Sequence, residues 1–343
     1  MKAVLVDYDD DLFDISPAAL RYMRETLAAA GAMLVVAQCR TEEHVLRLAA
    51  DADLVMIQTV RPLLNARVIP RLARCRGIIR LGLGYDSVDL AAATAAGVPV
   101  SNVVDWCTDE VAEHAIALLF ACARHLAPLH ETVSDGGWDR TRARGIHRLR
   151  GQTLGIVGFG RIGRAVGQRM SAFGVKVLAY DPWLDADAIA RAGAEKVELD
   201  DLMRRADLIS LHTPLTPETH HLIGRREFAL MKEGAIIVNT SRGPVMDEAA
   251  LAEALRSGRL GGAGLDVMER EPLPADSPLR GMPNVVFTTH VASYSAEAVE
   301  TLYRFGADIA VEMLAGKWVH TIVNPEVKER MAARWARLDG KIA

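Results

Sequence analysis

The sequence predicts an α/β protein with two doubly wound parallel sheets. Short apolar segments alternate with helical ones over roughly the first 100 residues, and a second series of the same kind begins at Gly151. Buried parallel strands have this appearance, because helices cover both faces of such a sheet. The length supports the same fold class, since 343 residues are more than a single core usually organises.

The first domain is expected to begin with a strand and to alternate from there. Its strands are expected at residues 3–6, 33–38, 54–58 and 78–81, and its helices at residues 16–31 and 42–50. An Ala/Leu-rich segment from Asp109 to about Leu126 predicts one long helix, capped near Thr108 or Asp109. The polar, Arg-rich segment from His130 to Arg150 is interpreted as a connecting arm.

The second domain is expected to be a complete doubly wound unit. Its strands are expected at residues 153–157, 176–180, 208–211, 235–239, 262–266 and 285–288, and its helices at residues 162–173 and 248–257. A helical tail at 295–314 follows the completed unit, so we expect it to pack on the first domain. The predicted domains are therefore residues 1–102 with 295–343, which would bind substrate, and residues 103–294, which would bind a dinucleotide. The chain would cross between them near residues 100–110 and 290–295.

Charge and composition narrow the class of protein. A net charge of −4 and a pI near 6.2 argue against a nucleic-acid partner, which requires a basic surface. No apolar run approaches the roughly 20 residues that span a bilayer, and the segment Met1–Asp7 is interpreted as a strand rather than a signal peptide. The four cysteines lack metal-ligand spacing, so we expect no metal site and mostly buried thiols in a reducing, cytoplasmic compartment.

A glycine-rich turn predicts a dinucleotide site. The run Gly158-Phe159-Gly160-Arg161-Ile162-Gly163 follows an apolar strand and opens a helix. In such a turn Gly158 permits the tight bend, Gly160 lets the backbone approach a pyrophosphate, and Gly163 allows the helix to pack closely on the strand. The helix then offers its unpaired N–H groups to the phosphates. Arg161 and Ile162, at the start of this helix, are further candidate cofactor contacts.

The strand after this turn ends in an acid that favours NAD over NADP. Asp181 lies about 20 residues beyond the glycines, where a carboxylate binds the adenosine ribose. The carboxylate would repel a 2′-phosphate, and the next residues, Pro182 and Trp183, include no arginine to bind one. We therefore expect NAD as the cofactor.

Polar side chains follow each of the later predicted strands. In an open parallel sheet, ligands bind outside the carboxyl ends of the strands. The residues at these ends are His212-Thr213, Thr240-Ser241-Arg242, Asp266 with Glu271 shortly after it, and His290. We expect them to gather around one ligand site, with His114 and His212 in mainly structural roles.

Three of these side chains suit the reduction of a 2-keto acid. Arg242 presents a planar fork that can bind carboxylate and carbonyl oxygens. His290 can donate a proton during reduction and accept it during oxidation, because histidine titrates near neutrality. Glu271 would favour the imidazolium form and orient the ring. Asp266 is expected to bind the nicotinamide amide or ribose rather than to transfer protons.

These motifs resemble the D-isomer-specific 2-hydroxyacid dehydrogenase family over nearly the whole chain. The resemblance is carried by the runs at residues 154–163, 211–217, 231–247, 264–272 and 284–290. It implies a Rossmann NAD domain inserted into a flavodoxin-like substrate domain, with Arg242, Glu271 and His290 as the catalytic set. It also implies a homodimer and a substrate-carboxylate loop in which Leu83 and Gly84 offer backbone N–H groups. The implied cofactor contacts are Arg161, Ile162, Asp181, Thr213, Thr240, Asp266 and Thr108.

The sequence departs from the family pattern at two points and leaves one alternative function open. Thr289 stands where the family usually has a proline before the histidine, and residues 291–294 lack its usual glycine pair. Glu271 disfavours a formate dehydrogenase, which has glutamine there, and Leu83 disfavours a phosphite dehydrogenase, which has lysine. The run at residues 105–111 resembles the branch near the C-terminal-binding proteins and phosphoglycerate dehydrogenases. An NADH-sensing corepressor is therefore the alternative to a reductase of glyoxylate, hydroxypyruvate or a 3-phosphoglycerate-like acid.

Overall fold

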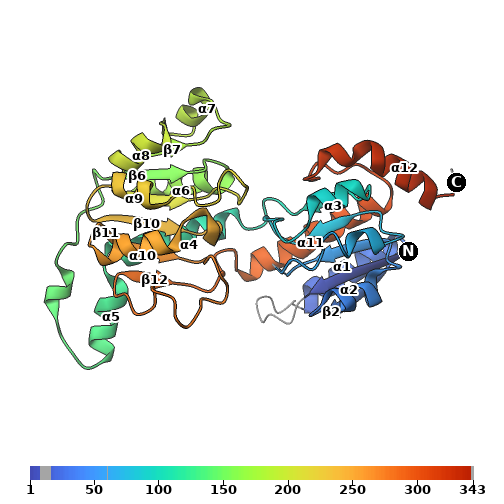
Figure 1. The fold of residues 1–343 in the computed structure, drawn as a ribbon, viewed down its shortest axis with the longest axis horizontal. Coiled ribbons are helices and arrows are strands. Elements are labelled where there is room, and N and C mark those ends of the chain that lie inside the picture. The colour runs from blue at the N-terminus through green and yellow to red at the C-terminus, as the bar shows by residue number, and fades with distance from the viewer. Residues whose placement is uncertain (8–16, 60, 341–343) are drawn as a thin grey trace. The chain divides into compact units, whose positions relative to one another are not determined.

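The chain divides into two compact units (Figure 1). The structure is a computed structural model that describes residues 1–7, 17–59 and 61–340. Unit 1 comprises Met1–Trp106 and Ser295–Ala343, and unit 2 is the continuous segment Cys107–Tyr294. The first boundary falls after Trp106, whereas the sequence reading placed it after Asn102. The expected start of the first helix, at Ser16, lies outside the described residues.

Unit 1 is built on a five-stranded parallel sheet in the order β2-β1-β3-β4-β5. This is the flavodoxin-like strand order. Every residue of β3 is buried, as expected for a central strand covered on both faces. Helix α11 packs against α1, so the chain returns to this unit after unit 2 is complete. The strands are β1 (Lys2–Asp7), β2 (Met33–Gln38), β3 (Leu54–Ile57), β4 (Ile78–Arg80) and β5 (Val100–Asn102), and the helices are α1 (Pro17–Ala29), α2 (Glu42–Ala49), α3 (Leu90–Ala95), α11 (Ala296–Leu314) and α12 (Lys328–Leu338).

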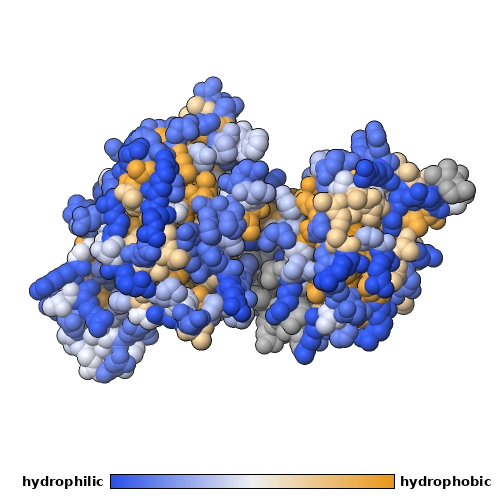
Figure 2. All heavy atoms as spheres, viewed as in Figure 1, coloured by the Kyte–Doolittle hydropathy of each residue, from blue (hydrophilic) through white to orange (hydrophobic). Residues whose placement is uncertain are grey.

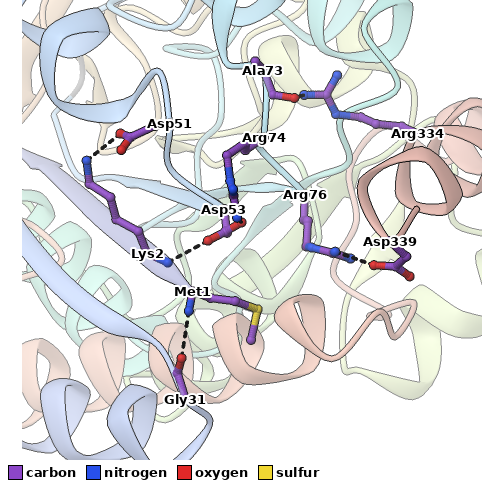
Figure 3. Close-up of polar contacts among 10 residues, drawn as sticks. All are labelled: Met1, Lys2, Gly31, Asp51, Asp53, Ala73, Arg74, Arg76, Arg334 and Asp339. Atoms are coloured by element: carbon purple, nitrogen blue, oxygen red, sulfur yellow. Dashed lines mark hydrogen bonds and ion pairs between the residues drawn. The ribbon is translucent and has the colours of Figure 1, made fainter. Parts of the chain in front are cut away.

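A network of hydrogen bonds and ion pairs connects the amino ends of β1 and β3 in unit 1 (Figure 3). The Asp53 carboxylate, which is almost fully buried, accepts hydrogen bonds from the backbone N–H of Lys2 and from the Arg74 guanidinium. Lys2 also forms an ion pair with Asp51. These bonds tie the start of β1 to the start of β3.

One side chain of the last helix anchors α12 to this unit. Arg334 donates to the carbonyl oxygens of Leu72, Ala73, Cys75 and Ala96. Its bond to Ala73 is drawn in Figure 3, together with the Arg76–Asp339 ion pair. A guanidinium has five N–H donors in a rigid fork, which allows one arginine to satisfy several carbonyl groups.

Unit 2 contains a seven-stranded parallel sheet in the order β12-β11-β10-β9-β6-β7-β8. The order reverses between β6 and β9, which is where open α/β sheets bind dinucleotides. Both predicted parallel sheets are therefore confirmed. The strands are β6 (Thr153–Val157), β7 (Lys176–Tyr180), β8 (Glu195–Lys196), β9 (Leu208–Leu211), β10 (Ala235–Asn239), β11 (Leu260–Leu265) and β12 (Val285–Phe287), and the helices are α4 (Thr108–Ala123), α5 (Leu126–Ser134), α6 (Arg161–Ser171), α7 (Ala186–Arg191), α8 (Leu199–Arg205), α9 (Arg225–Leu230) and α10 (Glu248–Arg256).

The long helix expected at residues 109–126 is present as α4, which ends slightly earlier than expected, and a second helix, α5, follows it. Helix α4 ends at Ala123, His125 adopts a left-handed φ of 52°, and α5 begins at Leu126. Pro128 explains the break, because in a continuous helix its ring would clash with the carbonyl group of Arg124. The expected cap was also wrong, since the residue before the helix is Cys107, which makes no side-chain cap. The Arg-rich arm correspondingly begins with a helix that extends to Ser134.

Apolar side chains fill the interiors of both units. The visible faces in Figure 2 are mostly hydrophilic, with smaller hydrophobic areas between them. The largest fully buried side chains include Tyr303 and Met23 in unit 1, and Phe159 and Phe228 in unit 2. Each sheet therefore has its own hydrophobic core.

Candidate active site

The glycine turn lies at the end of β6, where the strand order reverses. Gly158 has φ +88°, and a Cβ atom there would lie 2.8 Å from the carbonyl carbon of His212. A Cβ on Gly163 would lie 2.3 Å from the carbonyl oxygen of Gly158. A Cβ on Gly160, in contrast, would meet no described atom within 4 Å. The outer two glycines are thus required by the fold, whereas Gly160 borders open space beside the amino end of α6.

Asp181 is held against this turn. Its carboxylate accepts a 2.9 Å hydrogen bond from the Phe159 N–H and another of 2.9 Å from the Trp183 N–H. The acid therefore lies beside the glycine turn, with one remaining lone pair on each oxygen for a ribose hydroxyl. Arg161 is the first residue of α6 and is exposed, and Ile162 beside it is half-buried.

Two buried hydroxyl groups at adjacent strand ends have no partner among the described residues. Thr213 follows β9 and Thr240 follows β10, and their side-chain oxygens make no hydrogen bond in the described chain. The two residues are only 8% and 9% exposed. A buried hydroxyl without a partner is costly and is usually satisfied by a ligand or water. Together with the space at Gly160, these groups fit a polar cofactor such as NAD. Thr108, the remaining expected contact, is the first residue of α4.

His212, which precedes Thr213, has a structural environment. Its Nε2 lies 2.8 Å from the Ser210 hydroxyl oxygen. Burial lowers the pKa of His212 to about 4, so its ring is neutral near pH 7. A neutral imidazole whose Nε2 is bonded to Ser210 is not suited to exchange protons with a substrate.

The structure brings Glu271 and His290 together at the carboxyl ends of β11 and β12. Glu271 Oε2 lies 2.8 Å from His290 Nδ1, and both side chains are partly exposed. Glu271 Oε1 accepts a 3.1 Å bond from the Met268 N–H, which fixes the carboxylate. His290 has φ 58°, a left-handed conformation that is uncommon outside glycine.

Asp266 holds the segment that contains His290. Its Oδ1 accepts from the Val291 N–H at 2.9 Å and its Oδ2 accepts from the Ala292 N–H at 3.0 Å. Its backbone oxygen accepts from the His290 N–H at 2.8 Å. The residue is only 1% exposed. Both carboxylate oxygens of Asp266 thus already accept hydrogen bonds from the protein. The expected contact between Asp266 and NAD stays a prediction, and it would be made in addition to these bonds.

Arg242 follows β10, the neighbour of β11. The Asn239 side chain shapes this turn by donating to the Arg242 carbonyl oxygen at 2.8 Å and accepting from the Ser241 N–H at 2.9 Å. The Arg242 guanidinium is partly buried and donates to the Ser241 carbonyl oxygen. The arginine thus lies on the same edge of the sheet as the Glu271–His290 pair.

The expected substrate loop lies in unit 1, just after β4. Gly82 has φ +147°, Leu83 is exposed, and Gly84 is half-buried. The Asn102 side chain donates to the Leu83 carbonyl oxygen at 2.7 Å. This bond orients the peptide between Leu83 and Gly84, which would supply one of the two N–H groups expected to bind a carboxylate.

Sequence reasoning missed two side chains next to the Asp266 carboxylate. Thr288 Oγ1 donates to Asp266 Oδ1 at 2.6 Å, and His114 Nε2 lies 2.9 Å from the Thr288 oxygen. Thr288 could have been found from its place at the end of a predicted strand. His114 lies on α4, far away in the sequence, and no local pattern connects it to this site.

Comparison with known proteins assigns this chain to a family. Residues 116–292 match the family model for the NAD-binding domain of D-isomer-specific 2-hydroxyacid dehydrogenases. This chain belongs to that family. The match covers the glycine turn, Asp181 and all three strand ends of the Arg242, Glu271 and His290 set. NAD is therefore the cofactor, as the sequence predicted.

Curated relatives and solved structures agree with this assignment. D-3-phosphoglycerate dehydrogenase of Methanocaldococcus jannaschii is 40% identical over 290 residues, covering 84% of this chain and 55% of the relative. The chain thus spans about half the length of that relative. Glyoxylate reductase of Korarchaeum cryptofilum is 39% identical over 281 residues. The matched region covers 81% of this chain and 84% of the relative. The crystal structure of a glyoxylate reductase from Paecilomyes thermophila has a TM-score of 0.83 at 29% identity and covers 95% of this chain and 98% of its own.

The described residues contain neither a cluster of metal ligands nor a helix that could span a membrane. Within residues 1–7, 17–59 and 61–340, no group of three His, Cys, Asp or Glu side chains could hold a metal ion. The helices in these ranges are too short or too polar to cross a membrane.

Proposed function

We propose that this chain catalyses the NAD-dependent reduction of a small 2-keto acid to a D-2-hydroxy acid. The observation that carries the proposal is the 2.8 Å bond between His290 Nδ1 and Glu271 Oε2, at the ligand end of an NAD-binding sheet. The names of the relatives support glyoxylate, hydroxypyruvate or a 3-phosphoglycerate-like acid as the substrate class. We propose that NAD contacts the residues of the glycine turn (Gly158, Gly160, Arg161, Ile162 and Gly163). We propose further NAD contacts at Asp181, Thr213, Thr240, Asp266 and Thr108.

Each catalytic side chain has a distinct part in this proposal. NAD, when bound, supplies or accepts the hydride. Glu271 occupies Nδ1 of His290, so Nε2 is the nitrogen that donates a proton to the carbonyl oxygen during reduction and takes it back during oxidation. Glu271 also stabilises the positive charge of the imidazolium. Arg242 binds the carboxylate and polarises the carbonyl oxygen, and the N–H groups of Leu83 and Gly84 bind the carboxylate.

A substrate panel with one variant tests this proposal. NADH oxidation is measured with 2-keto acids that carry or lack a phosphate group, for the wild type and for His290→Asn. Asparagine tolerates the left-handed conformation at position 290 but has no proton to exchange at neutral pH. The variant should turn over about 10²–10⁴ times more slowly with unchanged NADH affinity. His320→Asn, at an exposed position in unit 1, is the control and should behave as the wild type.

Near-normal turnover in His290→Asn would overturn the assignment of the proton donor. NADH binding without turnover of any acid would instead favour the alternative function, an NADH-sensing interaction protein.

We also propose that the protein is a homodimer in which α5 contributes to the interface. None of the nine described residues of α5 is buried, and Leu126 and Val133 on it are more than half exposed. Trp138, shortly after it, is 82% exposed. A helix this short gains most of its stability from packing, which a second copy would provide. Sedimentation equilibrium of the wild type and of Val133→Lys tests this, and a monomeric wild type would contradict it.

We further propose a cytoplasmic location. All four cysteines are buried free thiols, which suits a reducing compartment. Cell fractionation checks this location.

A further inference from the structure

We propose that His114 is a positioning residue for His290, acting through Thr288 and Asp266. The inference rests on the proposed function, because it concerns the placement of the same proton donor. His114 lies on α4, Thr288 follows β12, and Asp266 follows β11. The three side chains form a continuous hydrogen-bonded row, with His114 Nε2 2.9 Å from Thr288 Oγ1, which is 2.6 Å from Asp266 Oδ1.

Hydrogen-bond chemistry fixes the direction of this row. The Thr288 hydroxyl has a single proton, and it is donated to the Asp266 carboxylate, which can only accept. The hydroxyl oxygen must therefore accept from His114, so Nε2 of His114 carries a proton. The same Nε2 lies 3.6 Å from Asp266 Oδ1, which places its positive end towards the carboxylate. His114 thus compensates a carboxylate that is almost fully buried.

The Asp266 carboxylate transmits this arrangement to His290. It binds the N–H groups of Val291 and Ala292, and the Asp266 carbonyl group binds the N–H of His290 itself. These bonds hold His290 in its left-handed conformation, which costs free energy and persists only where neighbouring contacts impose it. The ring orientation needed to meet both Glu271 and a substrate therefore depends on the Asp266 carboxylate staying in place.

The residue before His290 gives this row added weight. Thr289 has no ring to restrict its backbone, as a proline would have. The segment is held instead by hydrogen bonds, from the Thr288 N–H to Leu265 and from the Thr288 hydroxyl to Asp266. Loss of the His114 bond should loosen residues 288–292 without altering the NAD contacts at the glycine turn.

Matched variants of the full chain test the inference. His114→Gln keeps an N–H at the reach of Nε2, and His114→Leu removes it, and both residues are good helix formers. Thr288→Ser keeps the hydroxyl, and Thr288→Val removes it. For each variant, amide hydrogen exchange of residues 288–294, kcat for keto-acid reduction and NADH affinity are measured.

Removal of either group should raise exchange at Val291 and Ala292 about tenfold or more. It should lower kcat about tenfold or more, since small misplacements of a catalytic group are costly. NADH affinity should change much less than kcat, because the contacts proposed at the glycine turn, Asp181, Thr213 and Thr240 do not involve this row. The two conservative variants, His114→Gln and Thr288→Ser, should resemble the wild type. The double variant His114→Leu/Thr288→Val should lose little more kcat than the worse of its two single variants.

Equal losses in His114→Gln and His114→Leu, or unchanged exchange in both His114→Leu and Thr288→Val, would overturn the inference. The exchange measurement separates this failure from that of the proposed function. If the wild type reduces no 2-keto acid, the proposed function fails, and the exchange rates alone decide whether His114 positions this segment.

Discussion

Gly243 lies against the backbone of Met268. A Cβ atom on Gly243 would fall 1.9 Å from the Met268 carbonyl carbon, and the Glu269 nitrogen would also be within 2.3 Å of it. The turn that carries Arg242 is therefore in direct contact with the loop that leads to Glu271. Two groups of the candidate active site are thus placed by one close approach of two backbones, which only glycine permits.

Replacing Gly243 with alanine should damage both fold and activity. The Cβ would meet backbone atoms, which cannot move aside as a flexible side chain can, so we expect a loss of about 2 kcal/mol or more in the free energy of unfolding. Urea unfolding and kcat measure the two effects. Gly160→Ala is the control, because its Cβ would meet open space. It should keep wild-type stability and weaken only NADH binding. Equal stability of the two variants would contradict the argument.

Arg242→Lys should raise the KM for the keto acid about tenfold or more. A lysine ammonium is a point charge and cannot bind carboxylate and carbonyl oxygens at once. NADH affinity should stay within about twofold, which fluorescence titration can show. Arg191→Lys, at an exposed position on α7 of the same unit, should change neither quantity. An unchanged KM in Arg242→Lys would count against this arginine as the carboxylate-binding group.

Thr240→Val should separate cofactor binding from stability. The Thr240 hydroxyl is buried without a partner in the described chain, so its removal should leave the cofactor-free protein as stable as before or slightly more so. The NADH dissociation constant should rise by about 2- to 15-fold, the value of one hydrogen bond.

The matched control for Thr240→Val is Thr321→Val. Thr321 is buried in unit 1, but its hydroxyl is hydrogen-bonded to Ser101 at 2.7 Å. This substitution should destabilise the fold and leave NADH affinity unchanged. A stability loss in Thr240→Val as large as in Thr321→Val would show that the Thr240 hydroxyl has a partner within the protein.

Acid should destabilise the protein through His212. Burial lowers its pKa in the folded state from 6.5 to about 4, so between these values the unfolded state binds more protons than the folded state. The contribution of the neutral His212 to the free energy of unfolding is therefore fully present above pH 6.5. It is lost as the pH falls towards 4, and the total loss is on the order of 3 kcal/mol. Urea unfolding at several pH values should show a flatter dependence for His212→Gln than for the wild type. Identical slopes would exclude His212 as the source.

Much of the fold followed from the sequence because the central strands are short, apolar and bounded by polar residues. The limits of β2, β6, β7, β9 and β10 coincide with the predicted ones. Helices such as α3, α7 and α9 were not anticipated, since six residues are too few to show a helical period. Helix α5 was not anticipated either, because the polar segment from His130 was interpreted as a connecting arm.

The candidate site was predictable to the extent that topology alone determines it. Glu271 and His290 follow adjacent strands of one parallel sheet, so the strand-end rule was sufficient to bring them together. His114 was assigned a structural role because its position depends on how α4 packs on β11 and β12. The rotation of a helix against a sheet is set by side-chain packing, which no local sequence pattern reveals.

The attachment of Arg334 has a consequence for the order in which the protein forms during synthesis. Unit 2 is one continuous segment, so the contacts within it can form as soon as Tyr294 has left the ribosome. Unit 1 must wait, because the carbonyl groups of Leu72 to Ala96 receive their donors from a residue about 240–260 positions later. Since domains fold as units during translation, the second unit in the sequence completes its fold before the first. The amino-terminal strands are synthesised first, but the unit that contains them is the last to complete its hydrogen bonds.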